Sequence, residues 1–166
     1  LLQGLEAIPH VQRVRIHTRL PVVLPERIDA GFLAMWNSLR RLQRVVVIHA
    51  NHAQELRAAA DVQAALGALR ASGTTLLNQS VLLRGVNDSI AALEELSVAL
   101  FESGVLPYYL HLLDPVRGAA HFDVPADSAR RLLAQLTARL PGYLVPKLVR
   151  EDPGAASKTM LPPASR

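Results

Sequence analysis

The sequence predicts an α/β fold with a largely parallel sheet, and three observations lead to that prediction. Five short segments are rich in Val, Leu, Ile or Tyr, as buried strands are. Four longer segments with the periodicity of amphipathic helices lie between them. The regular alternation of the two kinds is typical of βαβ units, in which successive strands lie parallel to one another.

The five predicted strands are too few for a closed barrel. They cover residues 11–18, 44–51, 75–83, 105–113 and 143–151. A complete eight-stranded barrel needs about 250 residues, so five strands fit a partial TIM-type β/α barrel or an open sheet. An arc of a barrel leaves an unpaired strand edge at each end.

The four predicted helices rest on capping signals as well as on periodicity. They cover residues 26–42, 54–71, 89–102 and 127–140. Pro25 stands where proline is tolerated, at the start of a helix. We expect Asn87 and Asp88 to cap the third helix and Gly73 to end the second.

The composition fits one globular domain. Half of the 166 residues are apolar, which excludes wholesale disorder. No stretch approaches the roughly 18 unbroken apolar residues of a membrane span. The first residues lack an initiator Met, a basic region and a cleavage site, so they do not form a signal peptide. We therefore expect a fragment of a longer cytoplasmic protein.

Charge and cysteine content disfavour several functions. The 18 basic and 14 acidic residues give a net charge of +4, but the basic residues are scattered and aromatics make up only 4%. Nucleic-acid binding is disfavoured, because it relies on basic patches and stacking platforms. The chain has no cysteine, which excludes a disulfide framework, a thiol nucleophile and iron–sulfur ligands of its own.

Polar side chains gather at the predicted carboxyl ends of the strands, where parallel α/β folds bind their ligands. They are His17, Thr18, Arg19, His49, Asn51, His52, His111, Asp114, Glu151 and Asp152, with Gln79 inside the third strand. The alternative is that these groups satisfy loop backbone atoms or face solvent. A metal site at His49 and His52 is disfavoured, because no third ligand is marked.

The segment 150–159, REDPGAASKT, combines a Pro-Gly turn, small residues and Lys158. Small residues let backbone N–H groups approach an anion such as phosphate. A lysine beside them could neutralise phosphate or form a Schiff base. Lys147 is the only rival lysine in the chain. Taken alone, a solvated tail lysine is the simpler interpretation of Lys158.

Three acids stand near this segment: Asp114, Glu151 and Asp152. Two carboxylates could clamp an ammonium group, because each oxygen accepts a charge-assisted hydrogen bond. The simpler alternative is that they cap helices or turns.

Five segments together resemble lysine 2,3-aminomutases, radical S-adenosylmethionine enzymes that also use pyridoxal phosphate. The segments are RVRIHTRLPVVLPERI (13–28), VVIHANHAQEL (46–56), LNQSVLLRGVND (77–88), YYLHLLDPVRGAAHF (108–122) and GYLVPKLVREDPGAASKT (142–159). The chain ends soon after Lys158 and carries R-E-x-x-G-x-x-S-K-T. Both features resemble the short subfamily that β-lysylates elongation factor P, although Pro153 departs from its pattern.

The resemblance implies a division of the chain and a role for six residues. Residues 1–150 would be the C-terminal part of a radical S-adenosylmethionine β/α barrel, and residues 151–166 the pyridoxal-phosphate loop and tail. Lys158 would bind pyridoxal phosphate as a Schiff base. Asp114 and Glu151 would bind the distal ammonium of the substrate lysine, although free-lysine enzymes have Asp at the position of Glu151. Gln79, Asn51 and His52 fall in segments on the S-adenosylmethionine side.

The implied reaction converts L-α-lysine to β-lysine with a 5′-deoxyadenosyl radical, which a [4Fe-4S] cluster generates from S-adenosylmethionine. The cluster needs a C-x-x-x-C-x-x-C motif that this chain lacks, so its ligands would lie outside the chain and the chain alone would be inactive. The alternatives are a non-catalytic α/β ligand-binding module or remnant and an ordinary pyridoxal-phosphate enzyme. A homo-oligomer is compatible with the sequence, and no membrane partner is expected.

Overall fold

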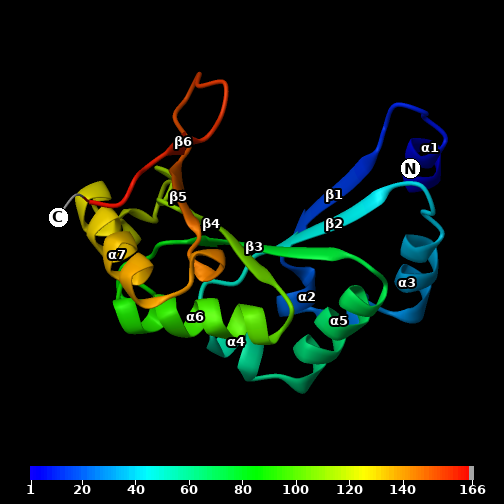
Figure 1. Ribbon diagram of the computed structural model, residues 1–166, viewed down its shortest axis with the longest axis horizontal. Helices are drawn as coiled ribbons and strands as arrows, with labels where there is room; N and C mark the ends of the chain where they lie inside the picture. Colours follow the sequence, from blue (N-terminus) through cyan, green and yellow to red (C-terminus); the bar gives the residue numbers. More distant parts are fainter. Residues whose placement is uncertain (165–166) are drawn as a thin grey trace.

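A computed structural model describes residues 1–164 and shows one six-stranded sheet in the order β1-β2-β3-β4-β5-β6 (Figure 1). Neighbouring strands up to β5 are parallel, and β6 pairs with β5 in the antiparallel sense. The strands are β1 (Arg13–Thr18), β2 (Gln43–Ile48), β3 (Thr75–Val81), β4 (Leu106–His111), β5 (Lys147–Arg150) and β6 (Thr159–Met160). Sequence order and spatial order coincide, as in an arc cut from a β/α barrel.

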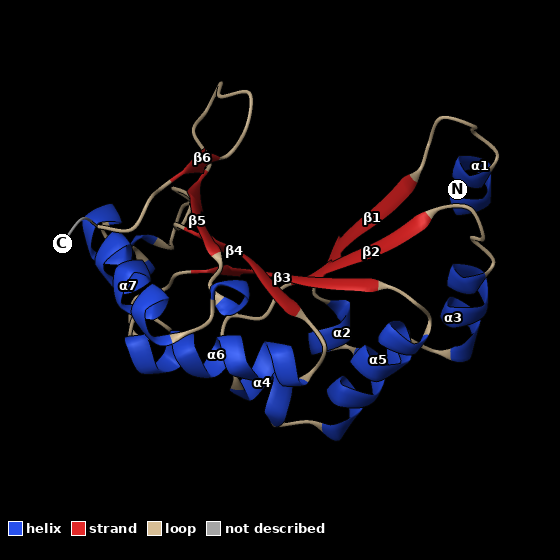
Figure 2. Ribbon diagram, in the orientation of Figure 1, coloured by secondary structure: helices blue, strands red, loops and turns tan. Residues whose placement is uncertain are grey.

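The sheet is curved, with helices along its convex side and an open concave side (Figure 2). The helices are α1 (Leu2–Glu6), α2 (Leu20–Val23), α3 (Ala30–Asn37), α4 (Gln54–Arg57), α5 (Ala60–Ala71), α6 (Ile90–Glu102) and α7 (Ala126–Arg139). Short 3₁₀ turns cover Pro25–Arg27, Ala120–Phe122 and Gly142–Leu144. Because the connections cross one face only, the other face of the sheet is left free for a site.

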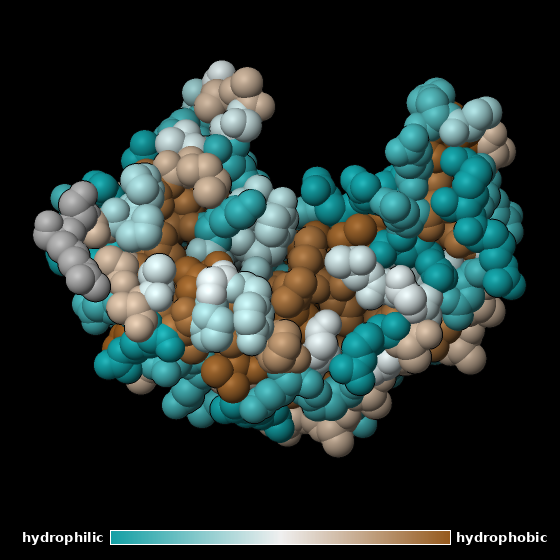
Figure 3. Space-filling model, in the orientation of Figure 1, coloured by the Kyte–Doolittle hydropathy of each residue, from teal (hydrophilic) through white to brown (hydrophobic). Residues whose placement is uncertain are grey.

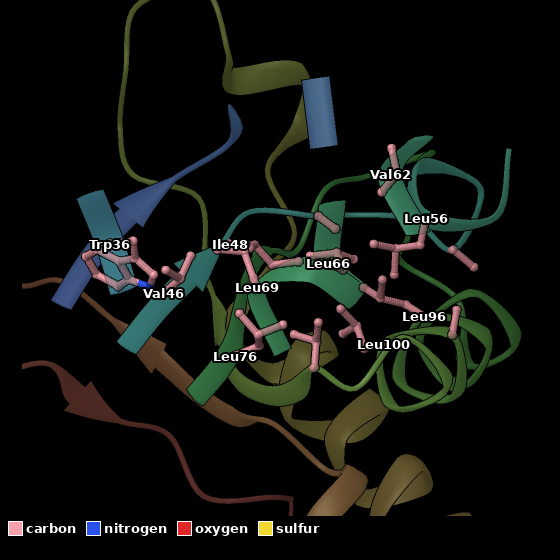
Figure 4. Close-up of a cluster of buried hydrophobic side chains, with 14 of the residues drawn as sticks. Trp36, Val46, Ile48, Leu56, Val62, Leu66, Leu69, Leu76, Leu96 and Leu100 are labelled. Atoms are coloured by element: carbon pink, nitrogen blue, oxygen red, sulfur yellow. The ribbon is translucent and has the colours of Figure 1, made fainter. Parts of the chain in front are cut away.

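Two apolar clusters fix the sheet to its helices. The larger one joins the first three strands to helices α3, α5 and α6, with Trp36, Ile48 and Leu66 fully buried (Figure 4). The second lies under α7 and contains Leu110, Leu136 and Leu148 among its buried side chains. Each fully buried large aliphatic side chain contributes about 1.5–3 kcal/mol. These clusters make the sheet a rigid support for residues on its concave side.

All five predicted strands are confirmed, with shorter boundaries. The fifth begins only at Lys147, because Pro146 has no N–H for pairing and Gly142–Leu144 forms a 3₁₀ turn. The two-residue β6 was not predicted, since pairing with β5 rather than composition defines it.

Two of the predicted helices are broken, which corrects the sequence prediction. The helix expected over 26–42 begins at Ala30, where the Asp29 carboxylate accepts a hydrogen bond from Phe32 N at 2.7 Å, and it ends at Asn37. Arg44 donates to the Trp36 carbonyl at that end. The helix expected over 54–71 is divided into α4 and α5 by Ala59, whose backbone is extended.

The expected cap at Asn87 and Asp88 was also wrong. Ser89 caps α6, accepting a hydrogen bond from Ala92 N. The buried Asn87 side chain instead accepts from Leu83 N and donates to the carbonyls of Asn51 and Val81. It therefore joins the loops that follow β2 and β3.

Within residues 1–164, no helix has both the length and the apolar character that crossing a membrane requires.

Candidate active site

A cavity of about 240 Å³ opens at the carboxyl ends of β2, β3, β4 and β5. Its polar lining includes His49, Gln79, His111, Asp114 and Glu151. The molecule is hollowed on the side away from the helices, between the β5–β6 loop and β1 (Figure 3). Three of the six residues singled out from the sequence, Gln79, Asp114 and Glu151, therefore line one cavity.

Gln79 connects two histidines on the concave side. Its Nε2 lies 2.7 Å from His49 Nε2, and its side chain also lies near enough to His17 to raise the pKa of that imidazole. Burial and the charge of Arg15 lower the pKa of His17, while the Gln79 contact opposes that shift. Burial, followed by the charges of His17 and Arg19, lowers the pKa of His49. Both imidazoles are therefore held neutral near pH 7, as hydrogen-bonding rather than charged groups.

His111, the last residue of β4, is 9% exposed, and its Nε2 has no hydrogen-bond partner among residues 1–164. Burial and the charge of Lys158 lower its pKa, whereas Glu151 and Asp114 raise it. Buried polar atoms are nearly always paired, so an orphan at a cavity wall is informative. Sequence analysis placed His111 at a strand end but did not include it among the site residues.

Lys158 lies at the end of the β5–β6 loop, where its ammonium forms an ion pair with the Glu151 carboxylate. Its Nζ is also 5.8 Å from the centroid of the Tyr109 ring, within cation–π range. The lysine hydrogen bond and charge lower the pKa of Glu151. An ammonium group is thus held by an aromatic face and by a carboxylate that lines the cavity.

The loop that carries Lys158 is closed by contacts at its base. Asp152 accepts a hydrogen bond from the Thr159 hydroxyl at 2.6 Å and one from Arg150 at 2.7 Å. The hydrogen bond from Thr159 is the larger cause of a lowered Asp152 pKa, and the hydrogen bond from Arg150 adds to it. The Asp152 carboxylate is therefore engaged by two side chains at the base of the loop, and the ammonium-binding role of Asp114 and Glu151 stays a prediction.

The rival lysine is placed differently. Lys147 is the first residue of β5, at the opposite end of that strand from Glu151. Among the described residues, only Lys158 forms an ion pair with one of the predicted ammonium-binding acids.

Asn51 and His52 make structural contacts outside the cavity lining. The Asn51 side-chain oxygen accepts from Val81 N at 2.9 Å. The His52 Nδ1 accepts from Gln54 N at 3.2 Å, at the start of α4. Both side chains therefore position loops, which makes a direct ligand contact less favourable than for Gln79. In the described part of the chain, no cluster of three or more His, Asp or Glu side chains could hold a metal.

Curated proteins are similar to this chain over nearly all of its length. The L-lysine 2,3-aminomutase of Escherichia coli K12 is 52% identical over 97% of the chain, and that of Haemophilus influenzae is 50% identical over 96%. This chain is a homologue of part of the lysine 2,3-aminomutases. The enzyme of Clostridium subterminale is more distant, at 37% identity over 98% of the chain. The resemblance stated from the sequence is thereby confirmed.

The chain spans about half the length of the relatives it matches, 46% of the first two and 38% of the clostridial one. A radical SAM methyltransferase from Sphaerobacter thermophilus shares the fold over 72% of this chain and 37% of its own, with a TM-score of 0.53 and 20% identity. No family model matches the chain.

Proposed function

We propose that this chain supplies the pyridoxal-phosphate lysine and the substrate-ammonium site of a lysine 2,3-aminomutase, an isomerase that converts L-α-lysine to β-lysine. The observation that carries the proposal is Lys158 at the rim of a cavity that Asp114 and Glu151 line. A primary amine and two carboxylates are the groups needed to attach an aldehyde coenzyme and to bind the distal ammonium of lysine.

Pyridoxal phosphate fits the residues present. Lys158 carries the amine that would hold it, its side chain is 31% exposed, and small residues precede it in the β5–β6 loop. When bound, the coenzyme supplies an electron sink for the migrating amino group. Asp114 and Glu151 would fix the far end of the substrate, which positions its backbone carbons for the reaction.

An iron–sulfur cluster does not fit the residues of this chain, which has no cysteine. We therefore infer that the chain alone does not isomerise lysine. S-adenosylmethionine would meet Gln79 on the concave face. The contacts of Asn51 and His52 support an indirect role for those two residues, through the loops that they position.

A role in modifying elongation factor P is the finer part of the proposal. The chain spans 46% of its more similar relatives but 37–38% of the more distant ones, so the more similar relatives have shorter chains. Their shorter length supports assignment to the short subfamily. Detection of β-lysine on elongation factor P, and its loss on deletion of the gene, would test that assignment.

Borohydride trapping tests the proposed role of Lys158. The folded chain is incubated with pyridoxal phosphate, reduced, digested and analysed by mass spectrometry. We expect the adduct on Lys158 and its loss in Lys158→Ala, which retains Lys147 as an internal control. Folded protein with no adduct, or with equal labelling of both lysines, would favour a non-catalytic binding module.

A further inference from the structure

The chain already holds an alkylammonium group at the cavity rim, namely its own Lys158. The ammonium contacts Glu151 and faces the Tyr109 ring, as described above. The side chain of a free lysine substrate ends in the same ammonium group, carried on the same kind of methylene chain. The Lys158 contacts therefore show how this surface receives an ammonium.

His111 supplies a further hydrogen-bonding atom beside these groups. It lines the cavity together with Asp114 and Glu151, and its buried Nε2 has no hydrogen-bond partner in the described part of the chain. A buried polar atom without a partner costs about 1–3 kcal/mol, so a ligand that satisfies it gains affinity. An ammonium has three N–H donors and two carboxylates can take two of them, which leaves one donor unpaired.

We propose that His111 is the third acceptor of the substrate's distal ammonium, completing a site with Asp114 and Glu151. The site is occupied in part by the Lys158 ammonium until Lys158 uses its amine to bind the coenzyme. This inference rests on the proposed function and adds a specificity-determining residue to it. The two acids supply the counter-charge that favours a protonated amine, and neutral His111 accepts its third N–H without adding a positive charge.

The charged and titratable neighbours of His111 agree with an acceptor role. Lys158, Glu151, Asp114 and His49 all act on it, and burial is the largest influence on its pKa, which is lowered. A neutral imidazole with its proton on Nδ1 leaves Nε2 free to accept. Protonation removes that acceptor, so the His111 contribution disappears as the pH falls through its lowered pKa.

Binding of n-pentylamine, an alkylammonium without a carboxylate, tests the proposal in the absence of coenzyme. Amide and imidazole NMR spectra of the full 166-residue chain report both the folded state and the binding. We expect the His111 Nε2 signal to be that of an unprotonated nitrogen and to shift on titration. We expect His111→Phe to weaken binding about tenfold, as loss of a hydrogen bond to a charged group implies.

Two further variants complete the test. His111→Gln keeps an acceptor oxygen, so we expect it to bind within about threefold of the wild type if the hydrogen bond is what matters. Lys158→Met removes the internal competitor, so binding should tighten roughly threefold, in line with the loss of an exposed ion pair. Undiminished binding by His111→Phe, or a proton on Nε2, would overturn the proposal.

Pentylamine binding and borohydride trapping can fail separately. Trapping at Lys158 without any pentylamine effect at His111 leaves the proposed function standing and overturns the third acceptor. Pentylamine binding that depends on His111, with no trapping at Lys158, supports the ammonium site and refutes the coenzyme role.

Discussion

The amide nitrogen of Gln79 lies 2.7 Å from His49 Nε2 and links the third strand of the sheet to the loop after the second. Its side chain also reaches His17 on the first strand. The uncharged Gln79 side chain on β3 therefore lies near His49, which follows β2, and near His17 on β1. The same face carries His111 and Tyr109 on β4, which pack edge to face with centroids 5.7 Å apart.

Replacement of Gln79 by leucine should lower the pKa of His17 further. The Gln79 hydrogen bond raises that pKa, while burial and Arg15 lower it, so removing the bond leaves only the lowering effects. Titration of the His17 ring signals by NMR measures the change. His111 serves as the control, because its lowered pKa comes from burial and from charged groups that do not include Gln79. An increase in the His17 pKa would contradict the bridging role of Gln79.

The ion pair between Lys158 and Glu151 should be visible in acid titrations. The lysine contact lowers the Glu151 pKa in the folded chain, so the pair persists above the ordinary glutamate value of 4.5 and is lost as the pH falls through the lowered pKa. In Lys158→Met the Glu151 pKa should return upward. Carbon-detected NMR of the side-chain carboxylates measures the Glu151 pKa in the wild type and in the variant.

Asp152 provides the control in the same spectra. Its lowered pKa depends on Thr159 and Arg150, neither of which is changed in Lys158→Met. If the pKa values of Glu151 and Asp152 rose equally in Lys158→Met, a change in the loop rather than loss of the ion pair would explain the Glu151 shift.

The buried hydrogen bond from Trp36 Nε1 to Thr74 Oγ1, 2.8 Å long, should be important for stability. Replacement of Thr74 by valine leaves the indole N–H without its partner, which we expect to lower the free energy of unfolding by about 1–3 kcal/mol. Urea unfolding followed by the fluorescence of the single tryptophan measures the loss. The neighbouring Thr75 is exposed, so Thr75→Val should change stability by less than about 0.5 kcal/mol. Equal effects of the two changes would refute the role assigned to this bond.

Asn87 should be one of the most sensitive loop positions. Its buried side chain makes three hydrogen bonds to backbone atoms of the loops after β2 and β3. Asn87→Ala leaves several of those groups unpaired, and we expect it to destabilise the chain by about 2–4 kcal/mol. Asp88→Ala, which removes a single hydrogen bond to Gly85 N, should cost less than about 1 kcal/mol. Urea unfolding followed by circular dichroism measures both losses of stability, and a larger loss for Asp88→Ala than for Asn87→Ala would contradict the role given to Asn87.

The strands were predictable because their signal is local. The run Val45–Val46–Val47–Ile48 is apolar and β-branched, and a central parallel strand buries both faces, as β2 does. The helix breaks were less predictable. Ala59 has an extended backbone that its residue type does not favour, and Gln63 compensates by donating to the Leu56 carbonyl at 2.8 Å.

The site was predictable in part. Asp114, Glu151 and Lys158 follow strands or lie in a small-residue loop, which are local signals. The orphan Nε2 of His111 depends on contacts between distant segments, which no local pattern specifies. A two-residue alternation did place Tyr109 and His111 on one face of β4, and that signal could have added both to the predicted site.

A chimera tests whether this chain carries the substrate and coenzyme residues of an aminomutase. The segment of the Escherichia coli relative that aligns with this chain is replaced by residues 1–166. The protein is reconstituted anaerobically with iron, sulfide, S-adenosylmethionine and pyridoxal phosphate, and β-lysine formed from L-lysine is measured by mass spectrometry. We predict that the chimera forms β-lysine and that its Lys158→Ala variant forms none. A folded, cofactor-loaded chimera that forms no β-lysine, or a Lys158→Ala variant that forms as much, would contradict this prediction.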